Sequence, residues 1–113
     1  MQKKGPSKNE LIEAVNAFME APFPERSTND EADQLHADLL LYDSAMGDLI
    51  MGIVQGERVP VEELVPDTDL RDRLTALLAQ GDPVAAPDAQ QYLDYLDRLD
   101  RLVAMARAVV KKR

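Results

Sequence analysis

The 113-residue sequence has room for one domain, or for one half of an obligate dimer, and its length excludes a multidomain enzyme. Hydrophobic residues make up 45% of it and charged residues 30%, a mixture typical of a folded globular protein. It has no cysteine and a single histidine, His36. This excludes a disulfide framework, a thiolate metal site and any site that needs two imidazoles from one chain.

The charges are segregated along the sequence. Residues 9–110 hold seven arginines and all 21 acidic residues, a net charge of 7 − 21 = −14, and the other basic residues lie at the two ends. A phosphate-binding surface needs clustered lysines and arginines, so nucleic acid is not an expected partner of this acidic body. We expect residues 1–6 and 112–113 to be flexible basic tails.

Residues 5–20 carry acidic residues and a helix-capping pattern instead of an uninterrupted apolar stretch. This predicts no signal peptide and favours a cytoplasmic location. The most apolar stretch, residues 37–54, contains Asp38, Asp43 and Asp48. Each aspartate would cost about 2.5–3.5 kcal/mol near the centre of a membrane span, so we expect a core helix there and no membrane association.

Capping signals and hydrophobic spacing predict a first helix over residues 8–21. Ser7 and Glu10 have the spacing of a capping box, in which each side chain accepts a hydrogen bond from the other residue's backbone N–H. Pro22 ends the segment because it has no N–H to donate. We expect Phe23, in the elbow that follows, to pack against the core. The apolar stripe of this helix consists of Leu11, Val15, Phe18 and Met19.

The second and longest helix is predicted over residues 28–55. It begins at another capping box, Thr28 with Glu31, and ends before Gly56, a residue type that favours the left-handed conformation found at helix ends. An unbroken heptad row runs along it: Ala32, Leu35, Leu39, Tyr42, Met46, Leu49 and Ile53. Seven positions in register predict one continuous helix.

Two more helices are predicted in the second half of the sequence. Residues 57–69 form a connector with one short helical turn, and a third helix covers residues 68–80 before Gly81. The fourth helix covers residues 87–111, with Pro87 in its first turn. The apolar face of this helix is broad: Ala89, Tyr92, Tyr95, Leu96, Leu99, Leu102, Val103, Ala106, Val109 and Val110.

No stretch alternates in the period-two pattern of a strand. The sequence therefore predicts a single all-α domain over residues 1–113. Its architecture is an antiparallel bundle of about four helices, two long (28–55 and 87–111) and two short (8–21 and 68–80).

The second helix carries another row of residues opposite its heptad row. This row also advances by steps of three and four: Ala37, Leu40, Ser44, Gly47, Met51 and Val54. The residues in the middle of the row, Ser44 and Gly47, have small side chains. Because glycine inside a helix costs about 1 kcal/mol relative to alanine, Gly47 and Gly52 are expected where another backbone comes close. We therefore expect this helix to be covered on two opposite faces.

Two arrangements would provide that cover. The fourth helix could take one face while the first and third take the other, which gives a closed monomeric bundle. Alternatively, the second row packs against its own copy across a two-fold axis. The first and third helices are shorter than the second and carry modest stripes, which favours the homodimer.

Acidic side chains provide the candidate chemistry. Asp33 and His36 lie on adjacent turns of the second helix, a geometry that metals accept. Two ligands do not make a site, and a partly buried or surface histidine is the favoured interpretation of His36.

Two pairs of aspartates have i,i+3 spacing: Asp30 with Asp33, and Asp94 with Asp97. On facing antiparallel helices, such pairs would clamp a magnesium ion and a pyrophosphate. These aspartate pairs resemble the paired acids of the all-α nucleoside triphosphate pyrophosphohydrolases, although the glutamate-rich pairs expected of that family are missing. The resemblance implies a divalent-metal-dependent phosphohydrolase. The simpler interpretation is a solvated charged face, on which Asp97 pairs with Arg101 one turn away.

The sequence shows no recognisable catalytic triad or glycine-rich phosphate loop, so we expect no catalytic residue and no cofactor. It predicts a small acidic interaction module, such as an adaptor, a chaperone-like protein or an inhibitor, that forms a homodimer. Such a module would bind another protein through apolar positions of the second helix or through the Pro22–Pro24 elbow. The alternatives are mimicry of a nucleic acid by the acidic body, and the phosphohydrolase.

Overall fold

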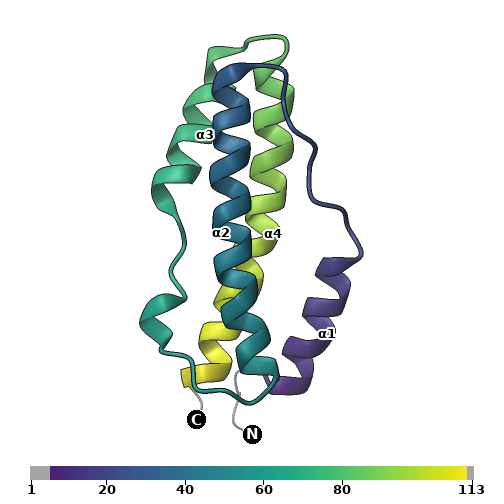
Figure 1. The fold of residues 1–113 in the computed structure, drawn as a ribbon, viewed down its shortest axis with the longest axis vertical. Helices are drawn as coiled ribbons and strands as arrows, with labels where there is room; N and C mark the ends of the chain where they lie inside the picture. Colours follow the sequence, from purple (N-terminus) through teal and green to yellow (C-terminus); the bar gives the residue numbers. More distant parts are fainter. Residues whose placement is uncertain (1–5, 112–113) are drawn as a thin grey trace, which may run out of the picture.

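The computed structural model describes residues 6–111, and within that range it is a bundle of α-helices without strands (Figure 1). The helices are α1 (Lys8–Met19), α2 (Asp30–Val54), α3 (Thr68–Gln80) and α4 (Ala85–Lys111), with a short 3₁₀ helix η1 (Val61–Glu63) before α3. The predicted fold class is confirmed. Residues 1–5 and 112–113, which belong to the predicted tails, lie outside the described residues.

Consecutive helices run in opposite directions, so α2 and α4 are parallel to each other (Figure 1). Hydrogen bonds between the two segments show this direction. Ser27, just before α2, donates to Asp88, and Tyr42 donates to Asp100 at 2.8 Å, so the positions advance together along both helices. This parallel relation matters for the aspartate pairs discussed below.

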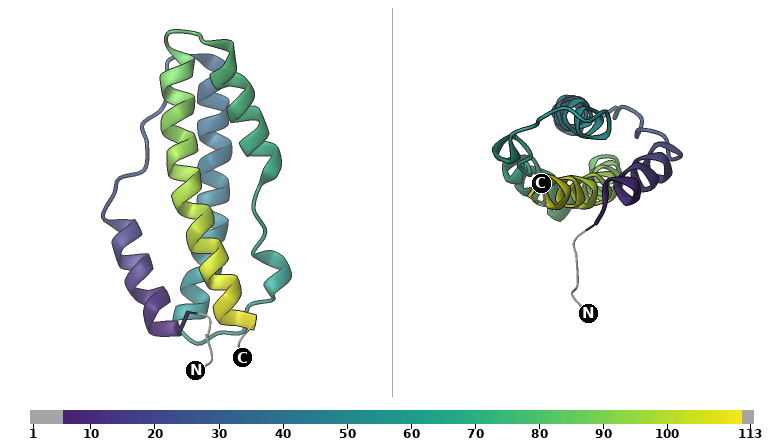
Figure 2. Two further views of the ribbon diagram at one scale, coloured as in Figure 1. Left: turned by 180° about the vertical axis from the view of Figure 1, so that it is seen from behind. Right: turned by 90° about the horizontal axis from the view of Figure 1, so that it is seen from below.

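The helix α4 is the centre of the bundle, because each of the other three helices packs more extensively against α4 than against any other helix. Its buried face runs the whole length of the helix and holds Ala89, Tyr92, Leu96, Leu99, Val103 and Ala106, among others. Viewed along the bundle, α1, α4 and α3 form an arc, and α2 lies opposite this arc (Figure 2). The heptad row of α2 faces the arc and is buried, apart from the partly buried Leu49.

The ends of three helices differ from the predictions. The capping box of Ser7 and Glu10 is present, but α1 ends at Met19, not at residue 21. The capping box at Thr28 is wrong, because the side chain of Asn29 caps α2 by accepting from the N–H of Ala32. Asparagine competes well with threonine for this position.

The start of α4 also lies earlier than predicted, at Ala85 and not at residue 87. The side chain of Asp82 accepts hydrogen bonds from the N–H groups of Val84 (3.0 Å) and Ala85 (2.8 Å). These bonds begin the helix one half-turn before Pro87. The hydrogen bonds from Ala85 and Val84 lower the pKa of Asp82, because they stabilise its charged form.

The connector between α2 and α3 contains one short helical turn, η1, as predicted, and this turn packs onto α4. Val59 and Leu64 are buried, whereas Val65 is half exposed. The guanidinium of Arg107 donates to the carbonyl oxygens of Val61 (3.2 Å) and Leu64 (2.7 Å), which ties η1 to the end of α4. Among the described residues, no helix has the length and apolar character needed to span a membrane.

We expect Asp82→Ala to lower the melting temperature near neutral pH, because two N–H groups at the start of α4 lose their acceptor. The folded-state pKa of Asp82 is depressed, so its stabilisation is present above the unfolded-state value of about 3.9 and is lost as pH falls through the folded-state value. Thermal unfolding of both proteins from about pH 7 to about pH 2 should show the gap closing. Asp72→Ala, an exposed aspartate of α3, is the control and should leave no such gap. A gap that persists in acid would contradict this role of the carboxylate.

Candidate interaction surface

The second row predicted on α2, which we call the outer row, is left mostly uncovered by the described residues. It comprises Ala37, Leu40, Ser44, Gly47, Met51 and Val54. Gly47 and Val54 are partly buried and the other four are exposed, with Leu40 46% and Met51 41% accessible. The closed monomeric bundle, in which two short helices cover this face, is therefore not the arrangement found.

The position of α2 explains this exposure. The helices α1 and α3 flank α4 and touch α2 only at its sides, so no helix lies over its outward face (Figure 2). The neighbouring Leu41 is also on the outside and is 70% exposed. Large apolar side chains that remain exposed along one helix are typical of a surface that another molecule covers.

The two glycines of α2 have different surroundings. A Cβ atom on Gly52 would lie 3.1 Å from a carboxylate oxygen of Glu57 and 3.4 Å from Val59, so this glycine makes room for the connector. A Cβ atom on Gly47 would meet no described atom of a neighbouring element within 4 Å. Our expectation that Gly47 marks a close backbone approach is therefore not met among the described residues.

An apolar groove of about 290 Å³ lies beside the outer row, between α1 and α2, with α4 at its base. Gly47 and Met51 belong to both the groove and the outer row. We call it the Met groove, and its lining residues are Val15, Phe18, Met19, Ala21, Asp43, Gly47, Ile50, Met51, Tyr95, Leu99 and Leu102. Sequence reasoning missed this groove, because it placed Met19 in the buried stripe of the first helix. Met19 is 69% exposed, since α1 ends at this residue.

The polar wall of the Met groove is a tyrosine–aspartate pair. The hydroxyl of Tyr95 donates to Asp43 at 2.7 Å, which joins α4 to α2. Burial of the phenol and the nearby carboxylate raise the pKa of Tyr95 well above its ordinary value, so the hydroxyl stays protonated and remains a donor. This hydrogen bond satisfies both the hydroxyl and the carboxylate, and the rest of the groove is apolar.

The predicted metal-binding aspartates are engaged elsewhere. Asp33 forms a two-contact ion pair with Arg26, and the hydrogen bond from Arg26 lowers the pKa of Asp33. Asp97 pairs with Arg71 of α3 at 2.6 Å, in place of the predicted partner one turn away. Asp94 accepts a hydrogen bond from Gln90.

The two aspartate pairs also lack the predicted orientation, because α2 and α4 are parallel and the pairs lie on different levels of the bundle. Asp30 is exposed at the start of α2, far along the helix from the level of Tyr95. Within residues 6–111, no three histidine or acidic side chains come together in a way that could hold a metal ion. The clamp suggested by the resemblance to pyrophosphohydrolases is thus not formed by the described residues.

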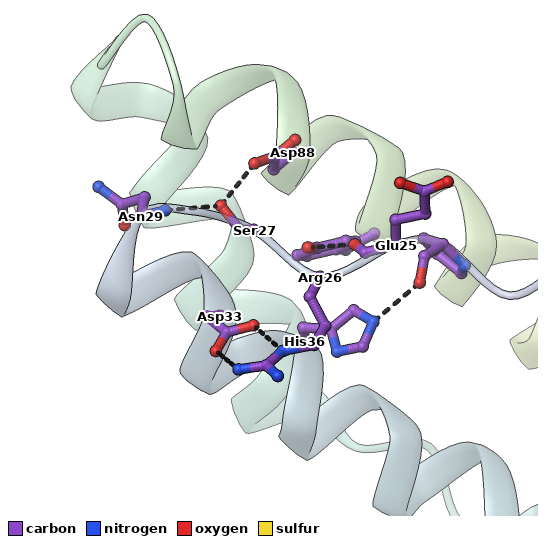
Figure 3. A network of polar contacts seen from close by, with 9 residues as sticks. Glu25, Arg26, Ser27, Asn29, Asp33, His36 and Asp88 are labelled. Carbon is purple, nitrogen blue, oxygen red and sulfur yellow. Dashed lines mark hydrogen bonds and ion pairs between the residues drawn. The ribbon is translucent and has the colours of Figure 1, made fainter.

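His36 is a buried structural residue at the elbow between α1 and α2 (Figure 3). Its Nε2 lies 2.8 Å from the carbonyl oxygen of Pro24, and its ring packs against Phe23 and Tyr92. The hydroxyl of Tyr92 donates to the carbonyl oxygen of Glu25, and burial raises the pKa of Tyr92 to about 12. These contacts hold the elbow against α2 and α4, and Phe23 packs against the core as predicted.

No family model, curated protein or solved structure matches this chain in the three comparisons with known proteins.

We expect Gly47→Ala to stabilise the isolated chain by about 0.5–1 kcal/mol, because alanine favours the helix and the added methyl group meets no neighbour. Gly81→Ala is the matched control and should destabilise the chain by about 1–2 kcal/mol, because Gly81 has a left-handed φ of 73°. Urea unfolding measures both changes in stability. The protein concentration should be low enough that the unfolding midpoint no longer depends on it, so that the single chain is compared. A loss of stability in Gly47→Ala would show that a neighbouring group already occupies this space.

We expect magnesium chloride to leave the melting temperature unchanged, because Asp33 and Asp97 are paired with arginines. Asp97→Asn should lower the melting temperature slightly, and by the same amount with or without magnesium, because its ion pair with Arg71 is surface-exposed. A rise of several degrees with magnesium, abolished by Asp33→Asn and Asp97→Asn, would instead establish a metal site.

Proposed function

We propose that this protein is a cytoplasmic protein–protein interaction module, with an adaptor, chaperone-like or inhibitory role, and that it forms a homodimer through the outer row of α2. The observation that carries the proposal is the exposure of this row, in which Leu40 and Met51 are accessible on one long helix. Burying such side chains against a partner would remove apolar surface from water, which favours association.

The order of residue sizes in the outer row supports a second copy as the partner. Read from either end, the row passes from a smaller apolar residue to a bulky one and then to a small centre. Each pair of equivalent positions has numbers that sum to the same value: 37 with 54, 40 with 51, and 44 with 47. An antiparallel two-fold pair brings together these positions, since each contact made by one copy is repeated by the other.

In this pairing, bulky side chains meet at the two ends of the contact and small residues meet at its middle. Leu40 of one copy would face Met51 of the other, and Ser44 would face Gly47 at the middle of the contact. Small central residues let two helix backbones approach toward the short end of the usual 8–10 Å range. The close approach would give Gly47 the neighbour that it lacks among residues 6–111. This accounts for a glycine in the middle of a long helix better than packing within the chain does.

The register predicts a specific pattern of disulfide cross-links between introduced cysteines. The sequence has no cysteine of its own that could form competing disulfides. Ser44→Cys mixed with Gly47→Cys should form mixed disulfide-linked dimers on mild oxidation, in greater yield than either variant forms alone. Isotope labelling of one chain distinguishes the products by intact mass. Ala79→Cys, exposed on α3, is the control and should cross-link only at the level of random collisions.

Two results would count against this dimer. If each variant cross-links best with itself, the helices pair in parallel and the antiparallel register is wrong. If sedimentation shows a monomer up to about 1 mM, where even weak specific association becomes visible, the homodimer itself is wrong.

The salt dependence of association separates a second copy from a basic partner. The sequence of α2 contains six acidic residues and no lysine or arginine. Two copies bring like charges together, so added sodium chloride should tighten the homodimer as the Debye length falls from about 30 Å at 0.01 M to about 10 Å at 0.1 M. Sedimentation equilibrium over that range measures the effect. Weaker self-association at higher salt would contradict a contact between two acidic faces.

A further inference from the structure

We propose that the Met groove is the receiving site for Leu40 of the second copy, so that each protomer completes the other's groove. This inference rests on the proposed homodimer and adds a specific binding site to it. It also gives α1 a part in the interface, which a contact between the two outer rows alone would not.

Leu40 lies on the same side of α2 as the groove. At 100° per residue, Leu40 and Gly47 differ by about 20° around the helix axis, and Gly47 lines the groove. Leu41 differs from Gly47 by about 120° and points to the other flank of α2, where α3 lies. Both leucines are exposed, so they provide a matched pair on opposite sides of the same contact.

The antiparallel two-fold register brings Leu40 of one copy to the correct height along the other. It places this leucine opposite Met51, which borders the groove together with Gly47 and Met19. The missing side chain at Gly47, about one helical turn from Met51, leaves a gap in the wall beside this level. The partner's leucine would enter the groove through this gap.

The groove suits an aliphatic side chain. Its walls are almost entirely apolar, and its acidic group, Asp43, already accepts a hydrogen bond from Tyr95. Met19 and Met51 have flexible, unbranched side chains that adapt to the shape of an inserted group. Both remain exposed in the single chain, at 69% and 41%, and both would be covered by the inserted leucine. The two exposed methionines and the exposed Leu40 are therefore explained by one contact.

The test compares the dimer dissociation constants of four proteins: wild type, Leu40→Ala, Met19→Ala and the double variant. We expect Leu40→Ala to weaken the dimer by at least about tenfold, because the two-fold axis removes the inserted side chain from both grooves. Met19→Ala should add little in the Leu40→Ala background, since the two residues act through the same contact.

Leu41→Ala is the control, and it should weaken the dimer by less than about threefold. Leu40 and Leu41 are both exposed in the single chain, so circular dichroism of each variant should match the wild type. This check separates a lost contact from a lost fold.

The outcomes distinguish the two proposals. A wild-type dimer in which Leu40→Ala and Leu41→Ala have equal effects, or in which the Leu40 and Met19 effects add, would overturn the groove contact and leave the homodimer standing. A monomeric wild type would overturn both. If that monomer binds a designed helix of leucine and lysine, and Met19→Ala abolishes binding, the groove belongs to a basic partner helix and not to a second copy.

Discussion

The structure depends on the burial of one broad apolar face, that of α4. Three other helices pack against this face, and they share it unequally: α1 and α3 lie beside α4, while α2 lies across from the arc that they form (Figure 2). The buried side chains of α4 extend from Ala85 to Val109, so the face is long enough to hold every other element in place. Because α2 meets this core along only one side, its opposite side is open.

Polar contacts at the edge of the core set the register of the helices. The carboxylate of Asp100 accepts a hydrogen bond from Tyr42 of α2 and another from Arg71 of α3, each at 2.8 Å. One residue of α4 thus aligns two neighbouring helices. Tyr95 and Asp43 form a second bond of this kind beside the Met groove. Burial raises the pKa of Tyr42 and Tyr95, so both hydroxyls remain donors over the physiological range. The same contacts use up carboxylates that could otherwise have bound a cation.

The outer row and the Met groove belong to one surface. In the proposed dimer, the row would supply a projecting leucine opposite Met51 of the other copy, and the gap at Gly47 lies one turn further along the same groove. The acidity of α2 works against this contact, and the apolar side chains favour it. The balance of these two effects would make the proposed association sensitive to ionic strength.

The sequence by itself determined the helices and their inner faces. Capping residues and hydrophobic spacing are local features, so α1, α2 and α3 begin within two residues of their predicted positions, and the heptad row of α2 is buried as expected. Only the tertiary structure decided which face remains open. Long-range geometry placed α1 and α3 at the sides of α4, exposed Met19, paired Asp97 with Arg71 and left the two aspartate pairs at different levels of the bundle. None of these outcomes follows from spacing along one helix, because each depends on where a different helix lies.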